Sequence, residues 1–346
     1  MPIHCRIPLR RFTQQEFGEL SYGVLREVFA IHNELGRFFE EGPYKRALAI
    51  RHPDIRLEEP IDVTFRTFTK QYFMDVLVAS GGLFEFKAVD RFSSRHRAQL
   101  LHYLLLTELK HGMLVNVRSE KVEREFVNSA LKREDRFTYM SEASGWDDRL
   151  PGALLVREIL LELLADWGTC LELPLYEAGL THFLGGDAVV LRPVQVLLDS
   201  TLLGEQPFRH AAEDVAFRLT AFEDPRAFER FLPQVDRLVR HTSLRALLWV
   251  NIARSRVTFT TVAPKEAAAR EARLKRVSVG CRVGQSGQGE KAFPRLTTVI
   301  CRWTVQPETL PVHPFKPCPA QIRTTDDATG FPPSADTNRA PDQHRA

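Results

Sequence analysis

The stretch FMDVLVASGGLFEFKAV, residues 73–89, places charged side chains inside two apolar segments. The segments are rich in Val, Leu and Phe and are separated by a glycine pair, a pattern that predicts two strands joined by a tight turn. Asp75 lies at the edge of the first segment, and Glu85 and Lys87 lie within the second. Charges in strands that should be buried indicate either a metal-dependent catalytic set or a salt-bridged hairpin.

The sequence on both sides of this hairpin predicts an α/β fold. Apolar residues at helical spacing within 19–36 predict a helix that stops at Gly36. The other expected elements are a helix at 40–51, strands at 56–65, 70–79 and 83–89, a helix at 94–109 and a strand at 110–117. This order is typical of a mixed sheet flanked by helices.

The hairpin charges suit metal-assisted hydrolysis of a phosphodiester. Carboxylates on adjacent strands, such as Asp75 and Glu85, can converge on one hard cation, Mg²⁺ or alternatively Mn²⁺. Glu85 and Lys87 are two residues apart in a strand, so their side chains share a face, and the ammonium would lie beside the metal and a scissile phosphate. Phe86 would point to the opposite, buried face. An acid-x-Lys string is also common in charged surface strands, so a cross-strand ion pair remains the alternative.

Further landmarks occur in order along residues 15–130: His32, Asn33, Leu35, Gly36, Glu41, Tyr44, Asp75, Glu85, Lys87, Gln99, Tyr103 and Asn116. On these residues, this part of the chain resembles the GxxExxY protein family of the PD-(D/E)XK nuclease superfamily. The chain departs from the namesake motif at Phe38, which stands where the first glycine belongs.

The resemblance implies a restriction-endonuclease-like core with a metal site. It implies that Glu41 joins Asp75 and Glu85 around Mg²⁺, and that Gln99 lies near the same pocket and holds a phosphate or a base. Each residue also has a structural alternative: Glu41 as a carboxylate favoured in a first helical turn, Asp75 as a strand cap, and Gln99 as a solvated helix residue.

Basic residues near the expected site are candidates for contact with nucleic acid. Arg95, Arg97 and Lys110 could bind a phosphate backbone, since such contacts supply non-specific affinity. A solvated loop before a helix is the alternative. The sequence has no helix-turn-helix, zinc-finger or RNP-like motif, so the choice between DNA and RNA stays open.

The second part of the chain repeats the first. Gly36 and Tyr44 have counterparts 132 residues on, and the offset reaches 135 at Asn116, a slow drift that indicates tandem duplication. At an offset of 135, Glu85 and Lys87 meet Thr220 and Phe222, Asp75 falls near His210 and Gln99 meets Gln234, while Glu41 meets Leu173 at 132. The second copy therefore loses the metal-site charges and is expected to be non-catalytic.

The domain division follows from these landmarks. We expect a nuclease-like domain at 1–132, a linker at 133–152, a degenerate nuclease-like repeat at 153–263, and a charged helix with a low-complexity, mostly disordered tail at 264–346. The two copies are candidates for pairing with each other within the chain.

Bulk composition limits the class of protein. The 346 residues are 44% hydrophobic with a net charge of only +3, so charge alone gives no argument for nucleic acid. Five scattered cysteines and the lack of a secretory or membrane-spanning segment favour a cytoplasmic protein without membrane contact. The sequence thus predicts a Mg²⁺-dependent nuclease-like protein acting on DNA or RNA, with a non-catalytic nucleic-acid- or protein-binding module as the alternative.

Overall fold

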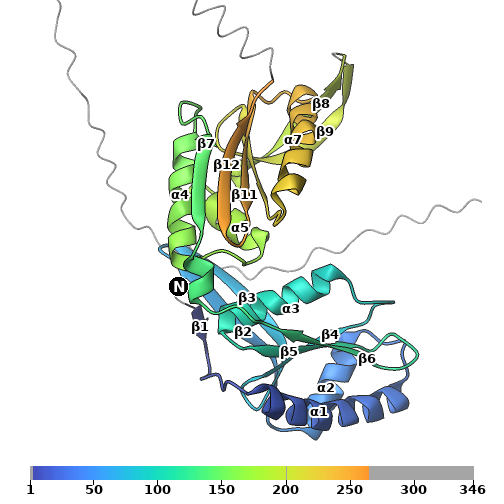
Figure 1. The fold of residues 1–346 in the computed structure, drawn as a ribbon. Coiled ribbons are helices and arrows are strands. Elements are labelled where there is room, and N and C mark those ends of the chain that lie inside the picture. The colour runs from blue at the N-terminus through green and yellow to red at the C-terminus, as the bar shows by residue number, and fades with distance from the viewer. Residues whose placement is uncertain (1–2, 200, 265–346) are drawn as a thin grey trace, which may run out of the picture. The chain divides into compact units, whose positions relative to one another are not determined.

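The computed structural model describes residues 3–199 and 201–264, which form two mixed β-sheets flanked by helices (Figure 1). The expected α/β class is confirmed. The first sheet and its helices comprise β1 (Ile3–Cys5), α1 (Gln14–Leu35), α2 (Glu41–Arg51), β2 (Ile55–Phe65), β3 (Phe68–Val78), β4 (Gly82–Lys87), α3 (Ser94–Thr107), β5 (His111–Asn116) and β6 (Glu123–Asn128). The strands lie in the order β1-β2-β3-β4-β5-β6, and only β4 and β5 run parallel. The helices and strands expected between residues 19 and 117 are confirmed, and β1 and β6 add to them.

Helix α1 begins and ends at sequence signals. Thr13 and Glu16 form a capping box, in which Thr13 Oγ1 accepts from Glu16 N at 3.2 Å and Glu16 Oε2 accepts from Thr13 N at 2.8 Å. Gly36 ends the helix with φ 73°, a left-handed conformation that glycine adopts without a steric penalty. The expected stop at Gly36 is therefore confirmed.

The β3–β4 turn consists of residues 79–81, so it includes Gly81 of the expected glycine pair, whereas Gly82 is the first residue of β4. Ala79 and Ser80 carry the positive φ angles of 46° and 58°. Gly81 is needed for a different reason: a Cβ there would lie 2.0 Å from the carbonyl oxygen of Arg10, whose N–H donates to Ser80 O at 2.8 Å. The absence of a side chain at Gly81 thus allows the segment before α1 to pack closely against the hairpin.

Helices cover both faces of the first sheet. Phe84 and Phe86 point to the α1–α2 face, where they join one buried cluster with Tyr44 and Leu48 of α2. Leu83 points to the α3 face and packs in a second cluster with Leu100. Because side chains alternate along a strand, the charged positions of β4 lie on the α3 face.

The second sheet repeats the pairing of the first. Its elements are η1 (Glu134–Phe137), β7 (Met140–Gly145), α4 (Ala153–Trp167), α5 (Leu173–Phe183), α6 (Asp187–Val190), β8 (Leu191–Leu198), β9 (Thr201–His210), β10 (Val215–Thr220), α7 (Pro225–Arg240), β11 (Ala246–Ile252) and β12 (Arg256–Val262). Strands β8 to β12 pair as β2 to β6 do, with β10 and β11 as the parallel pair. Strand β7 extends this sheet beside β12, although it lies in the segment 133–152 that was expected to be a linker. The domain division itself stays a prediction, and nearly all of the expected tail lies outside the described residues.

Matching hydrogen bonds support the duplication. Tyr44 donates its hydroxyl to Gly36 O at 2.5 Å, and Tyr176 donates to Gly168 O at 2.6 Å. Each copy also has a buried asparagine near the end of the second strand of its parallel pair (β5 or β11). The side chain of this asparagine binds the N–H and the carbonyl of one loop residue. Asn116 binds Val89 in this way, and Asn251 binds Phe222. These contacts hold the loop that follows β4 or β10.

The two copies share one hydrophobic cluster, to which both sheets contribute. Tyr72 of β3 donates to Glu172 Oε1 at 2.7 Å. The buried guanidinium of Arg136 donates to the carbonyls of Leu105, Thr169 and Trp167, and so joins α3 to the second copy. None of the helices in the described residues is long and apolar enough to cross a membrane.

Candidate active site

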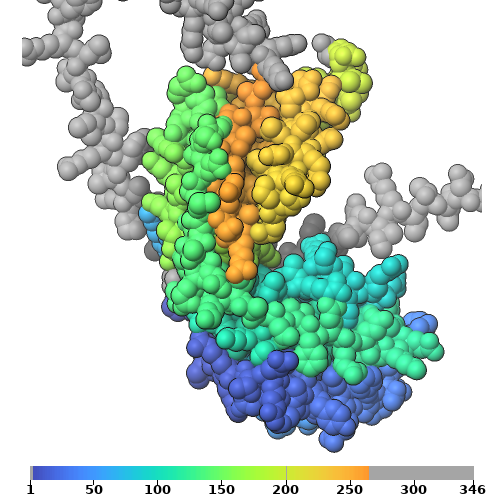
Figure 2. Space-filling model, in the orientation of Figure 1, coloured from blue at the N-terminus to red at the C-terminus, as the bar shows by residue number. Residues whose placement is uncertain are grey.

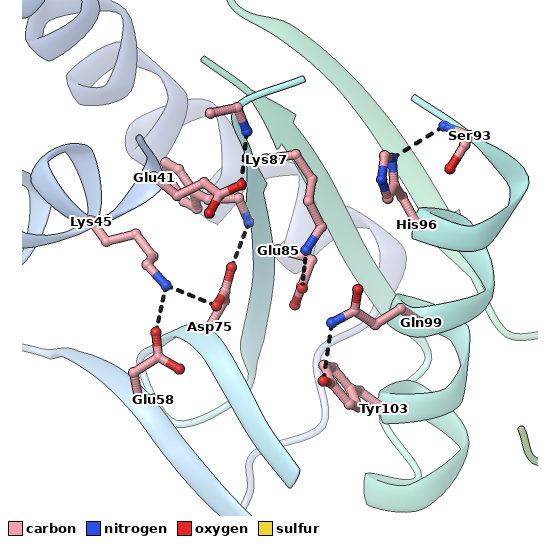
Figure 3. Close-up of polar contacts among 12 residues, drawn as sticks. Glu41, Lys45, Glu58, Asp75, Glu85, Lys87, Ser93, His96, Gln99 and Tyr103 are labelled. Atoms are coloured by element: carbon pink, nitrogen blue, oxygen red, sulfur yellow. Dashed lines mark hydrogen bonds and ion pairs between the residues drawn. The ribbon is translucent and has the colours of Figure 1, made fainter. Parts of the chain in front are cut away.

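Three charged side chains of the β3–β4 hairpin form a compact cluster (Figure 3). Lys87 Nζ lies 2.7 Å from Glu85 Oε1, and both side chains leave the same face of β4. Asp75, on the neighbouring strand β3, accepts from the N–H of Phe86 at 3.0 Å. The hairpin therefore brings together Asp75, Glu85 and Lys87, as the sequence predicted.

Glu85 is the most buried charged group of this cluster. The residue is 1% exposed, and its Oε2 atom has no hydrogen-bond partner among the described residues. Burial, and then the nearby charge of Asp75, raises the pKa of the Glu85 carboxyl to about 7, although Lys87 acts in the opposite direction. A buried carboxylate oxygen without a partner is costly, so this position favours binding of a cation.

Lys45 of α2 is a member of the site that the sequence analysis missed. Its ammonium lies 2.8 Å from Asp75 Oδ1 and 2.5 Å from Glu58 Oε1, and its side chain is 12% exposed. Burial acts to lower the pKa of Lys45, but the hydrogen bonds to the two carboxylates outweigh it and the net shift is upward. Lys45 follows Glu41 by one helical turn, and this i, i+4 spacing is the signal that could have placed it on the same face.

Glu41, the first residue of α2, reaches the same hairpin. Its Oε1 accepts from the N–H of Ala88 at 2.9 Å, directly after Lys87. The preceding loop is held by the hydrogen bond from Tyr44 to Gly36, and Phe38 points into solvent with 81% exposure. The departure from the motif at Phe38 therefore leaves Glu41 facing the hairpin.

Helix α3 supplies polar groups on the other side of the cluster. Gln99 Nε2 donates to Tyr103 Oη at 3.1 Å, and Figure 3 shows the Gln99 amide directed toward Glu85. Burial and the charge of Glu85 contribute to raising the pKa of Tyr103 to about 12. His96 accepts from the N–H of Ser93 at 3.1 Å and completes a helix cap, as a structural residue.

The donor set fits a hard cation in part. Within residues 3–199 and 201–264, no three His, Cys, Asp or Glu side chains form a ready ligand group. Asp75 is instead engaged by Lys45, and Glu85 by Lys87. The free Oε2 of Glu85 beside the Asp75 carboxylate is the observation that fits Mg²⁺, which prefers such oxygens. The metal role of Glu41, Asp75 and Glu85 stays a proposal.

The three basic residues expected to contact nucleic acid lie in different environments. Arg95 is exposed at the start of α3. Arg97 is held by Glu125, with Nη2 and Oε2 2.7 Å apart. Lys110 lies directly before the first residue of β5. Lys87 lies beside Asn116, the last residue of β5, so the length of this strand separates Lys110 from the cluster. The structure thus places Arg95 about one helical turn before Gln99 on α3, and Lys110 at the end of β5 away from Lys87.

The register of the second sheet corrects the expected residue equivalences. Lys87 pairs with Asn116 in the first sheet and Thr220 pairs with Asn251 in the second, so Thr220 takes the position of Lys87. Arg218 accordingly takes the position of Glu85. The offset at β10 is 133, and the drift to 135 arises only after this strand, because the segment between the two parallel strands has 25 residues (221–245) in the second copy and 23 residues (88–110) in the first. The pairing of Glu85 and Lys87 with Thr220 and Phe222 was therefore wrong.

The same correction applies to Asp75. Val76 pairs with Phe84 in the first sheet, and Arg209 pairs with the equivalent Phe217 in the second. Arg209 therefore takes the position of Val76. The preceding residue, the buried Phe208, takes the position of Asp75, which was expected near His210. The second copy has neither carboxylate, as expected, but it carries an arginine where a neutral residue was predicted.

The first copy is an α/β domain with a mixed sheet between helices and with an Asp, a buried Glu and a Lys on one hairpin. Residues 18–128 match the family model of the PD-(D/E)XK nuclease superfamily, whose members are typically metal-dependent. These residues, from α1 to the last residue of β6, therefore form a PD-(D/E)XK nuclease superfamily domain. No curated protein and no solved structure matches the chain.

Proposed function

We propose that the first copy is a Mg²⁺-dependent nuclease that hydrolyses phosphodiester bonds of nucleic acid, and that it belongs to the GxxExxY family. The observation that carries the proposal is the buried Glu85, whose Oε2 has no partner among the described residues and whose Oε1 faces Lys87. A structural ion pair would satisfy both oxygens of a buried carboxylate. The superfamily match over residues 18–128 supports the reaction class.

The chain's own residues have separable roles in this proposal. Asp75 and Glu85 would hold the cation, with Glu41 approaching from α2. When bound, Mg²⁺ supplies Lewis-acid polarisation of a phosphoryl oxygen. Lys87 keeps its ammonium at the edge of the cluster, with 15% exposure, where it can orient water and stabilise negative charge that develops on a phosphate.

Two further groups of the first copy act on substrate. Gln99 can exchange its hydrogen bond with Tyr103 for one to a phosphate or base, because its amide offers two donors. Arg95 can contact the nucleic-acid backbone beyond the site, since its exposed side chain lies about one turn before Gln99 on α3.

A non-catalytic binding module is the second candidate, and one observation favours it. Lys45 and Lys87 already neutralise Asp75 and Glu85, so the cluster is charge-balanced without an added ion. Such a module would bind nucleic acid or a protein without breaking a bond, whereas the nuclease would hydrolyse the nucleic acid that it binds.

Cleavage assays separate the two candidates. The purified full chain, with Mg²⁺ or Mn²⁺, should cut single- or double-stranded DNA or RNA, and chelation of the metal should stop it. Lys87→Ala should remove cleavage, whereas Lys121→Ala, at an exposed lysine of the loop before β6, should retain it. Equal activity of the wild type and Lys87→Ala, with both folded, would refute the site assignment.

A further inference from the structure

The second sheet carries a cavity at the position where the first sheet carries its acidic cluster. The cavity, of about 230 Å³, lies between α7 and the strands β10 and β11. The space-filling view shows the surface of α7 (yellow) beside that of the last strands (orange) (Figure 2). Its lining includes Arg218, Thr220, Phe222, Phe231, Gln234 and Trp249. We call this cavity the α7 pocket.

The α7 pocket has a reversed charge relative to the first site. Arg218 occupies the strand position of Glu85, and Thr220 that of Lys87. Arg218 is exposed and makes no ion pair with any carboxylate in residues 3–199 and 201–264. A guanidinium repels a divalent cation but presents a fork of donors that matches a phosphate. The pocket is therefore suited to an anion and needs no metal.

Aromatic rings give the α7 pocket its apolar wall. The ring centroids of Phe222 and Phe231 are 4.6 Å apart, and Phe231 is 47% exposed. Trp249 is buried below them and stacks on Phe228 with centroids 4.1 Å apart. Exposed aromatic faces stack on nucleobases with little sequence preference.

Polar groups at the rim complete the match to one class of ligand. Gln234 is exposed on α7 and offers an amide that can pair with a base edge. The hydroxyl of Thr220 is already engaged by Trp249 Nε1 and Asn251 Oδ1, each at 3.0 Å. An apolar peptide side chain would use the aromatic wall but would leave Arg218 without an anionic partner. A base joined to a phosphate uses both.

We propose that the α7 pocket binds one nucleotide of a single-stranded nucleic acid, with the base against Phe222 and Phe231 and the phosphate on Arg218. This inference rests on the proposed function, because it assumes that the ligand of the chain is nucleic acid. It assigns the degenerate copy a metal-independent substrate-binding role.

The test is a binding measurement without divalent metal. Labelled oligothymidylate and oligouridylate of about 12 nucleotides, within the usual site size, are titrated with the full chain in EDTA and followed by fluorescence anisotropy. Arg218→Glu should weaken binding by about ten-fold or more. Phe231→Ala should weaken it by about five- to a hundred-fold, the range for loss of one base–aromatic stack. Neither side chain is buried, so both variants should remain folded, which thermal unfolding checks.

The matched control is Arg237→Glu, which makes the same charge change at an exposed position of α7 outside the pocket. The Arg237→Glu variant should bind the oligonucleotides with clearly higher affinity than the Arg218→Glu variant. The proposal is overturned if the wild type binds neither strand, if Arg218→Glu and Arg237→Glu weaken binding equally, or if Phe231→Ala binds as the wild type does. Cleavage is measured separately with Mg²⁺, so absence of cleavage refutes the proposed function and leaves the binding result standing.

Discussion

Replacing Glu85 by glutamine should stabilise the metal-free chain at alkaline pH. Burial first, and then the charge of Asp75, raises the pKa of Glu85 to about 7, while Lys87 and Lys45 act against the shift. The folded chain therefore keeps this proton to a higher pH than the unfolded chain, whose glutamates titrate near 4.5. The free energy of unfolding should fall as pH rises from about 4.5 to about 7, and should stay at the lower value above that range.

The size of the effect follows from the same shift. Each pKa unit corresponds to about 1.4 kcal/mol, so a shift from 4.5 to about 7 corresponds to about 3 kcal/mol at most. Glutamine has nearly the same shape and no charge, and its carbonyl still offers Lys87 an acceptor. Glu85→Gln should therefore gain up to about 3 kcal/mol near pH 8 and little near pH 5.

Urea unfolding of the full chain in EDTA, at about pH 5 and about pH 8, measures this difference. The control is Glu125→Gln, on the exposed strand β6, where the hydrogen bond from Arg97 lowers the pKa of the carboxyl. Loss of that charge should destabilise slightly at alkaline pH, opposite in sign to Glu85→Gln. A Glu85→Gln variant that is no more stable than the wild type near pH 8 would refute the reasoning.

Three further predictions address the metal, the missed lysine and the contact between the copies. Near pH 8, Mg²⁺ should raise the thermal unfolding midpoint of the wild type more than that of Glu85→Gln, because the ion gives Glu85 Oε2 a partner; equal shifts would contradict the ligand assignment. Lys45→Met should destabilise by about 1–3 kcal/mol in urea, because Asp75 loses a charged partner at 2.8 Å; the exposed Lys121→Met should change stability little. Arg136→Met should cost about 3–5 kcal/mol, since buried carbonyls of both copies lose their donor; a loss no larger than that of the exposed Arg133→Met would show that this contact is dispensable.

Local pattern was sufficient for most of the first copy. Helical spacing and Gly36 predicted α1, and period-two alternation predicted that Glu85 and Lys87 share a face while Phe86 is buried opposite. These features depend on residues close in the chain, so their geometry follows from the backbone period.

Edge strands were the elements that local pattern missed. Strand β6 (EREFVN) and strand β7 (MSEASG) are largely exposed and lack an apolar run, so their sequences resemble loops. They are strands because β5 and β12 offer them free backbone groups to pair with. Such pairing is a property of the assembled sheet.

Residue equivalence between the copies also needed the structure. The drifting offset indicated duplication, but two additional residues between β10 and β11 shifted the comparison, so the correspondence of Arg218 with Glu85 was missed. The strand register showed which residues correspond. Asn116 of β5 and Asn251 of β11 are equivalent, so their partners Lys87 and Thr220 are equivalent too.

The sequence by itself predicted the class of fold and the three hairpin charges and indicated a duplication, because periodicity and spacing act within a few residues or repeat along the chain. Only the tertiary structure decided that Lys45 meets Asp75, that Glu85 Oε2 is buried without a partner among the described residues, and that Arg218 faces the α7 pocket. These contacts join strands and helices that are distant in sequence. Their distances and burial arise from sheet register and helix packing, and no local pattern encodes them.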